Sequence, residues 1–157
     1  MYNSQVTMWQ KSIMNNKNLK TMFSHNTDHW ATPKNIYNYY IKHGYIDPCP
    51  LHSKEDNLNK KYENKKLFIN PPYSAIDKWT EFIKNNYKTN IIVLLIPART
   101  DTKYFHELIK LTPTIIFLKG RLKFNEKGTA PFPSILMIFV DVIKQLPLYT
   151  SIDPKKL

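Results

Sequence analysis

The segment Asn70-Pro71-Pro72-Tyr73 directly follows a short apolar run, and its residue types could act on an amino group. The side-chain oxygen of Asn70, held on a rigid turn, can accept a hydrogen bond from such a group, and the carbonyl of Pro71 can accept another. Two acceptors expose the lone pair of an exocyclic amino nitrogen, and the ring of Tyr73 offers a flat face on which an extruded base can stack. Proline holds these groups in position beforehand, as preorganised catalysis requires. The alternative is a proline-rich loop with a structural aromatic residue, which the complete motif after an apolar strand disfavours.

Length and composition indicate one domain with a polyanionic partner. The chain has 157 residues, enough for one core of ordinary size, and an aromatic fraction of 13% that argues against disorder. Its net charge of +11 fits a phosphate-rich partner, although a chain so rich in lysine and asparagine can also reflect a biased genome. The single cysteine, Cys49, excludes an internal disulfide, and the five histidines have no metal-ligand spacing. Since no apolar run approaches about 18 residues, we expect no membrane span, no metal and a cytoplasmic protein.

Apolar runs alternate with helical patterns along the chain, which predicts an α/β domain with about five mostly parallel strands flanked by helices. One helix should open with Thr32 as its N-cap and Pro33 as its first residue, and should end at Gly44. The other expected helices cover residues 75–87 and 102–111, and the expected strands cover residues 45–46, 66–69, 91–96, 114–118 and 134–140. Functional residues should gather at the carboxyl ends of these strands.

The chain divides at about residue 22. Residues 1–22 are polar and without clear periodicity, so we expect a loosely ordered extension, in which residues 8–14 could form a short docking helix. Residues 23–157 are expected to form a single catalytic domain.

The tetrapeptide NPPY after a strand is the signature of amino-methyltransferases that use S-adenosylmethionine (AdoMet). Five further segments occur in order around it: Trp30–Pro33 (WATP), Asp47–Cys49 (DPC), Leu94–His106 (LLIPARTDTKYFH), Lys119–Phe124 (KGRLKF) and Ala130–Ser134 (APFPS). From about residue 22 to 140, this series resembles the phage-type DNA adenine-N6 methyltransferases of the Dam group. The resemblance implies a reduced Rossmann-like, AdoMet-dependent methyltransferase fold. It also implies site-specific methyl transfer to the N6 amino group of adenine in double-stranded DNA, as a phage-encoded protection against restriction in the host cytoplasm.

The resemblance further implies a role for the residues of these motifs. Asn70 and the Pro71 carbonyl, held by Pro72, would bind the adenine amino group, and Tyr73 would stack on the flipped base. The residues implied for AdoMet binding are Trp30, Thr32, Pro33, Asp47, Pro48 and Asn70. Those implied for contact with substrate DNA are Tyr73, Ser74, Arg99, Asp101, Arg121 and Lys123. The oligomeric state is left open, with a homodimer as one option.

Three of these residues also have a structural interpretation. Asp101 could be a catalytic base, but an aspartate just before a helix is more often its N-cap. Arg99 and Arg121 suit bidentate contacts with an anion, and could equally form surface ion pairs.

The segment around Asp47 departs from the usual AdoMet-binding pattern. Asp47 is followed by Pro-Cys-Pro rather than by a glycine-rich turn, and only 23 positions (70 minus 47) separate it from Asn70. Glu55, Asp56 or Glu63 could replace the acid that usually clamps the ribose, or could simply be solvated. This departure keeps open a catalytically inactive methyltransferase fold that binds DNA or protein. A second alternative is a protein-glutamine methyltransferase, which also uses NPPY because a side-chain amide presents a similar planar amino group.

Overall fold

The computed structural model describes residues 30–51, 57–124, 128–141 and 149–156. The expected N-terminal extension with its docking helix lies outside these ranges, and so do Glu55 and Asp56. The division of the chain at residue 22 therefore stays a prediction.

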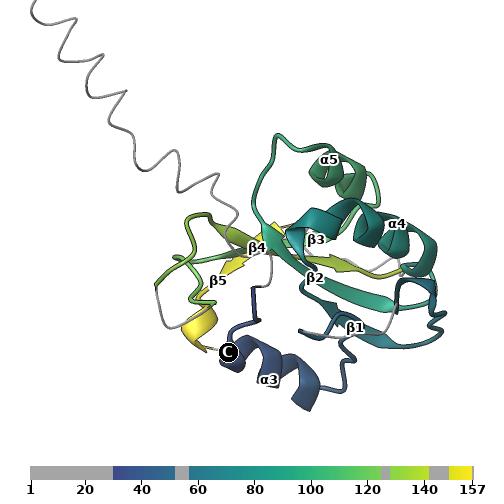
Figure 1. The fold of residues 1–157 in the computed structure, drawn as a ribbon, viewed down its shortest axis with the longest axis horizontal. Helices are drawn as coiled ribbons and strands as arrows, with labels where there is room; N and C mark the ends of the chain where they lie inside the picture. Colours follow the sequence, from purple (N-terminus) through teal and green to yellow (C-terminus); the bar gives the residue numbers. More distant parts are fainter. Residues whose placement is uncertain (1–29, 52–56, 125–127, 142–148, 157) are drawn as a thin grey trace, which may run out of the picture.

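Five strands form one sheet in the order β1-β2-β4-β3-β5 (Figure 1). The strands are β1 (Lys66–Ile69), β2 (Ile91–Pro97), β3 (Thr114–Leu118), β4 (Ser134–Phe139) and β5 (Tyr149–Ile152). β1 is parallel to β2 and β3 is parallel to β5, whereas β4 runs antiparallel to both of its neighbours. Four of the five strands therefore point the same way, which confirms the predicted α/β class and mostly parallel sheet.

The first expected strand is reduced to a single parallel bridge between Ile46 and Leu67. It continues the sheet beyond β1 through two hydrogen bonds, from Ile46 N to Lys66 O and from Phe68 N to Ile46 O. β1, β2 and β4 lie where they were predicted to within one residue, because their continuous apolar runs are buried on both faces. β5 was not predicted, and its residues are largely exposed.

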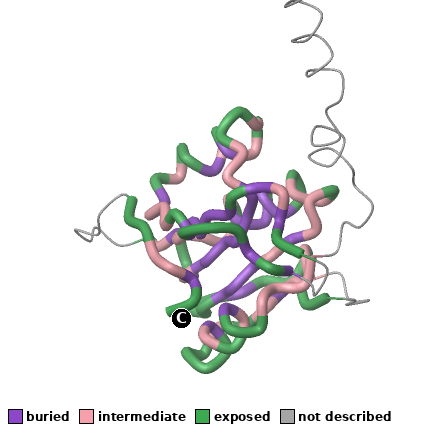
Figure 2. The backbone as a smooth tube through the Cα atoms, turned by 90° about the vertical axis from the view of Figure 1, so that its left-hand side faces the viewer, coloured by how far each residue is buried: buried purple, intermediate pink, exposed green. Residues whose placement is uncertain are grey.

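Helices cover both faces of the sheet, α4 (Ile76–Asn86) and α5 (Lys103–Ile109) on one side and α3 (Lys34–Lys42) on the other (Figure 1). The chain also forms three short 3-10 helices: η1 (Asn57–Asn59) before β1, η2 (Tyr73–Ala75) before α4, and η3 (Pro154–Lys156) after β5. Because side chains alternate along a strand, each strand contributes to two cores. Leu67 and Ile69 of β1 pack with α4 and α5, whereas Phe68 packs with α3. The buried residues follow the strands through the centre of the molecule in Figure 2.

The predicted end of α3 is confirmed. Gly44 adopts a positive φ of 78°, which a glycine reaches without strain, and its N–H donates to Ile41 O. The next N–H, of Tyr45, donates to Tyr40 O, and the rings of Tyr40 and Tyr45 lie 5.0 Å apart. These contacts form a Schellman motif with its apolar contact, which ends the helix and turns the chain toward Ile46.

The two predicted N-caps are wrong. The N-cap position of α3 is occupied by Pro33 rather than by Thr32, and the Thr32 hydroxyl is bonded elsewhere, to Asn70. The N-cap of α5 is Thr102 rather than Asp101, and the Thr102 hydroxyl donates to Arg99 O at 2.8 Å. At both helix starts the local sequence suggested a side-chain cap. In the structure, the hydroxyls of Thr32 and Thr102 bond to Asn70 and Arg99 instead, outside the helices.

Asn90 holds the entry of β1 against the turn between α4 and β2. It is 5% exposed, its Oδ1 accepts from Lys65 N, and its Nδ2 donates to Tyr62 O and Asn86 O. Its side chain therefore satisfies three main-chain groups, two in the stretch before β1 and one at the end of α4.

We expect the substitution Asn90→Ala to destabilise the fold by about 2–4 kcal/mol, because it leaves main-chain groups without partners in a buried place. Urea unfolding followed by circular dichroism measures this change. The matched control is Asn85→Ala on exposed helix surface, for which we expect a change within about 0.5 kcal/mol. A loss below about 1 kcal/mol for Asn90→Ala contradicts the assigned role.

Candidate active site

Strand direction gathers the predicted site residues at one edge of the sheet. Asp47 follows Ile46, Asn70 follows β1, residues 98–101 follow β2 and Arg121 lies shortly after β3. Since these strands are parallel to one another, the residues share the carboxyl edge, where ligands bind in open α/β sheets. β4 runs the opposite way, so its first residue, Ser134, lies at this edge as well.

The side-chain amide of Asn70 is fixed by two hydrogen bonds to the segment before α3. Its Nδ2 donates to Trp30 O at 2.6 Å and to Thr32 Oγ1 at 3.1 Å. Its Oδ1 is buried and has no hydrogen-bond partner among the residues that the structure describes. A buried acceptor without a partner costs about 1–3 kcal/mol, so such an atom calls for a functional explanation. The arrangement supplies a fixed acceptor with no competing donor.

Four aromatic rings pack against one another next to the segment that holds Asn70. We call them the aromatic cluster: Trp30, Tyr73, Phe124 and Phe132. The ring of Phe132 lies 5.9 Å from that of Trp30 and 5.6 Å from that of Tyr73, both edge to face. Phe124 lies 5.5 Å from Trp30. All four pack in the core on the α3 side of the sheet. The cluster thus places aromatic surface beside Trp30, whose carbonyl holds Asn70.

Asp47 provides a half-buried carboxylate at the same edge. Its Oδ1 accepts from Cys49 N at 2.8 Å, and burial raises its pKa from 3.8 to about 6 against the opposing effect of this bond. Within the described ranges no cationic side chain is paired with it. A carboxylate in this state favours a positively charged ligand group, which AdoMet offers in its ammonium and sulfonium. The residues present therefore fit that cofactor at its charged end.

Cys49, next to Asp47, is not suited to act as a nucleophile. Burial, with the neighbouring Asp47 charge, raises the pKa of its thiol to about 12, so the thiolate is scarce at neutral pH. Cys49 is instead a half-buried small residue that packs against the core on the α4 side of the sheet.

The polar residues expected to contact DNA differ in how exposed they are to solvent. Arg99 is half-buried, whereas Ser74, Asp101, Arg121 and Lys123 are exposed. Neither arginine forms an ion pair with any residue that the structure describes. Their role in contacting an anion stays a prediction.

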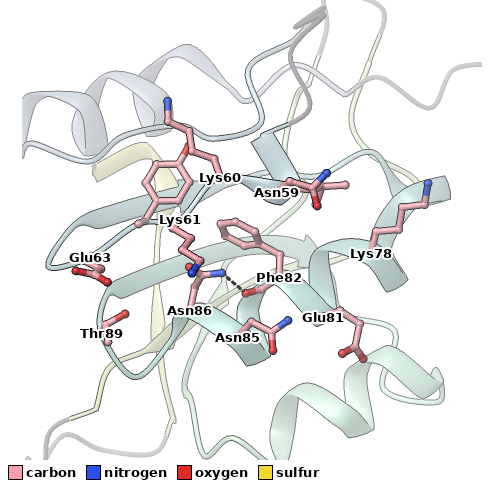
Figure 3. A pocket seen from close by; sticks show the side chains of 12 residues that line it. Asn59, Lys60, Lys61, Glu63, Lys78, Glu81, Phe82, Asn85, Asn86 and Thr89 are labelled. Carbon is pink, nitrogen blue, oxygen red and sulfur yellow. Dashed lines mark hydrogen bonds between the residues drawn. The ribbon is translucent and has the colours of Figure 1, made fainter.

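A separate cleft of about 830 Å³ lies between α4 and residues 58–63 (Figure 3). Lys60, Lys61 and Lys78 line it together with Glu63 and Glu81, so its charge is mixed. Glu63 comes before β1 and therefore lies near the amino ends of the strands, at the opposite edge from Asn70. Glu63 is thus not placed to clamp a ribose beside Asp47.

Comparison with known protein families decides the class of the chain. A family model described as DNA N-6-adenine-methyltransferase (Dam) matches residues 20–145. The chain belongs to this family. The match confirms the resemblance to the Dam group and implies a DNA adenine methyltransferase. Neither a curated protein nor a solved structure matches the chain.

Within this Dam-family fold, three residues at the edge were not predicted as site residues: Phe124, Phe132 and Ser134. Ser134 is 2% exposed, and its hydroxyl has no hydrogen-bond partner within the described ranges. Phe124 and Phe132 belong to the KGRLKF and APFPS segments that carried the resemblance, and this was the only signal for them. Their placement depends on the reversed direction of β4, which no local pattern reveals.

Neither a metal-binding cluster nor a membrane-spanning helix is present among the described residues. No group of three or more His, Cys, Asp or Glu side chains could hold a metal ion. No helix in these ranges is long and apolar enough to cross a bilayer.

We expect the substitution Asp47→Asn to stabilise the protein at pH 7.5 by about 1–3 kcal/mol and to have little effect at pH 4. A carboxyl whose pKa is higher in the folded chain binds more protons when folded. The free energy of unfolding of the native protein therefore falls as pH rises from about 4 to about 6. Asparagine keeps the acceptor for Cys49 N without the charge.

Urea unfolding at both pH values measures this effect, with the exposed Asp101→Asn as the matched control, expected within about 0.5 kcal/mol of the native protein. If Asp47→Asn were equally stabilising or destabilising at both pH values, burial of its charge would not be the cause.

Proposed function

We propose that this Dam-family protein transfers a methyl group from AdoMet to the N6 amino group of adenine in double-stranded DNA. The observation that carries the proposal is the buried Asn70 Oδ1, which has no partner in the described part of the chain while both N–H groups of the same amide are engaged. Such an atom can only accept, so it selects a donor such as an amino group. A role in protecting viral DNA from restriction is part of the proposal and rests on the resemblance to the phage-type members.

AdoMet would be held by Asp47 at its charged end and by the segment Trp30–Pro33, with Pro48 and Asn70 beside it. Pro48 is buried directly after Asp47, which fixes the backbone where a glycine-rich turn is more usual. When bound, AdoMet supplies a methyl group on a sulfonium for transfer to a nucleophile.

Asn70 and Pro71 would bind the adenine amino group through two acceptors, the side-chain oxygen and the Pro71 carbonyl. Neither Pro71 nor Pro72 has an N–H, so neither can place a competing donor beside the amino group. The Pro72 carbonyl is engaged by Ala75 N at 3.0 Å, which secures the turn into η2. The Asn70 side-chain oxygen and the Pro71 carbonyl would draw the amino hydrogens away from the plane of the adenine ring and expose the nitrogen lone pair.

The base would leave the duplex and stack on Tyr73, and the DNA would be held by residues at the rim of the edge. Arg99, Arg121 and Lys123 supply positive charge for phosphates, while Ser74 and Asp101 are exposed beside them. The net charge of +11 favours DNA over protein as the substrate.

Two alternatives predict different results in the same assays. A protein-glutamine methyltransferase would transfer label from tritiated AdoMet to protein and not to plasmid DNA. An inactive methyltransferase fold would show no binding of AdoMet or its demethylated product in calorimetry at millimolar ligand. N6-methyladenine in DNA from cells that express the protein, at a fixed sequence, supports the proposal and reveals the target site.

We expect the substitution Asn70→Ala to lower kcat for DNA methylation by about 10²–10³-fold, the usual cost of removing a preorganised hydrogen-bonding group. Label transferred to plasmid DNA measures the rate. Asn85→Ala, on the outer surface of α4, is the matched control and should keep the native rate. Full activity in Asn70→Ala would overturn the assignment of Asn70.

We expect Tyr73→Ala to weaken productive DNA binding by about 5–100-fold in KM, because base stacking on an aromatic ring contributes about 1–3 kcal/mol. Tyr73→Phe keeps the ring and should stay within about threefold of the native protein, since less than 1 kcal/mol is at stake. Steady-state kinetics with a duplex oligonucleotide that contains the target adenine separates the two variants. Equal loss in both would show that the hydroxyl, rather than the ring face, is what matters.

A further inference from the structure

We propose that Thr32 is a positioning residue for Asn70, whose hydroxyl holds the amide with its oxygen toward the substrate. The inference rests on the proposed function and deepens it. The resemblance to the Dam group implies that the segment Trp30–Pro33 contacts the cofactor. We assign the Thr32 side chain a different role, which is to hold Asn70.

The argument begins with the symmetry of an amide. Rotation of the Asn70 side chain by 180° exchanges Oδ1 and Nδ2, which have nearly the same size but opposite hydrogen-bonding roles. Only the orientation with Oδ1 toward the site can accept from an amino group, since Nδ2 would oppose it donor to donor. The orientation of this amide therefore decides whether the acceptor exists at all.

The segment before α3 selects the productive orientation. Trp30 O can only accept and lies 2.6 Å from Nδ2, so the rotated amide would place two oxygens against each other. Thr32 Oγ1 accepts the second N–H at 3.1 Å. Because a hydroxyl can also donate, Trp30 O decides which way the amide faces, and Thr32 adds the bond that keeps the amide there. With both N–H groups engaged, Asn70 has no donor left for the site, and a small rotation of the amide breaks at least one bond.

The two acceptors are themselves held from both sides. The Trp30 ring packs on Phe124 and Phe132, and Pro33, next to Thr32, accepts from Tyr37 N in the first turn of α3. α3 is in turn anchored on the sheet by Ile36, which is fully buried. Thr32 is thus a fixed point rather than a mobile side chain, which a positioning role requires.

Three variants test the proposal: Thr32→Val, which keeps the shape and removes the acceptor, Thr32→Ser, which keeps the hydroxyl, and Thr150→Val, a control on exposed β5. The first readout is hydrogen exchange of the Asn70 side-chain amide, followed by NMR on ¹⁵N-labelled protein. We expect exchange to rise about tenfold in Thr32→Val, as for the loss of one hydrogen bond, and to stay near the native rate in the other two.

The second readout is the division of the effect between kcat and binding. We expect kcat for DNA methylation to fall about tenfold in Thr32→Val, with KM for DNA and the affinity for S-adenosylhomocysteine within about twofold of native, and Thr32→Ser to restore kcat. A threonine that only stabilises the fold would not give this pattern. Loss of folded protein would lower the methylation rate and the amount of S-adenosylhomocysteine bound together, and would not change kcat alone.

Two outcomes overturn the proposal. Unchanged amide exchange in Thr32→Val shows that the hydroxyl does not hold Asn70. Weaker S-adenosylhomocysteine binding with unchanged kcat at saturation shows that Thr32 serves the cofactor instead. If the native protein methylates no DNA, the proposed function fails, and the exchange measurement then decides the contact by itself.

Discussion

Two hydrogen bonds from the Asn70 amide nitrogen join the end of β1 to the segment that leads into α3. Their acceptors, Trp30 O and Thr32 Oγ1, lie 40 and 38 positions earlier in the chain. The bonds connect the sheet to the chain that enters its covering helix, which strand pairing alone does not achieve. They also leave Oδ1 buried and without a partner among the described residues, at a cost of about 1–3 kcal/mol. In the proposed function, a ligand donor would offset this cost.

The reversed direction of β4 determines which residues share the edge with Asn70. Because β4 is antiparallel to β2 and β3, the connection of residues 119–133 begins and ends at the carboxyl edge. Its return is secured where Ala130 N donates to Leu122 O, and both residues are buried on the α3 side. This path brings Phe124 and Phe132 against Trp30 and Tyr73. A parallel β4 would need a crossover that starts it at the other edge, and the aromatic cluster would not form.

Much of the fold was predictable because burial leaves a pattern in the sequence. The apolar run of β2 and the rigid stop at Pro71 are local signals, and the structure contains both elements where they were expected. Contacts between distant residues leave no such pattern. Thr32 has the sequence of a helix cap, but a partner 38 positions away takes its hydroxyl. β5 was missed because its polar, exposed residues lack the alternation that marks a half-buried strand. Ser134 was predicted only as the start of a strand, and its position in the site follows from the direction of that strand.

The two ends of the site meet different physical demands. At the Asn70 end, the proposed function requires a neutral acceptor that is fixed before the substrate arrives, and two prolines and two hydrogen bonds would meet this requirement. At the Asp47 end, a charge must be kept in a half-buried place, and its raised pKa shows that burial opposes ionisation there. A bound cation favours the ionised form, so ligand binding and proton release at Asp47 are linked, and affinity for a cationic ligand must fall as pH drops below about 6. The charge that destabilises the empty fold is thus the one that strengthens binding, and substitution by a neutral residue exchanges binding affinity for stability.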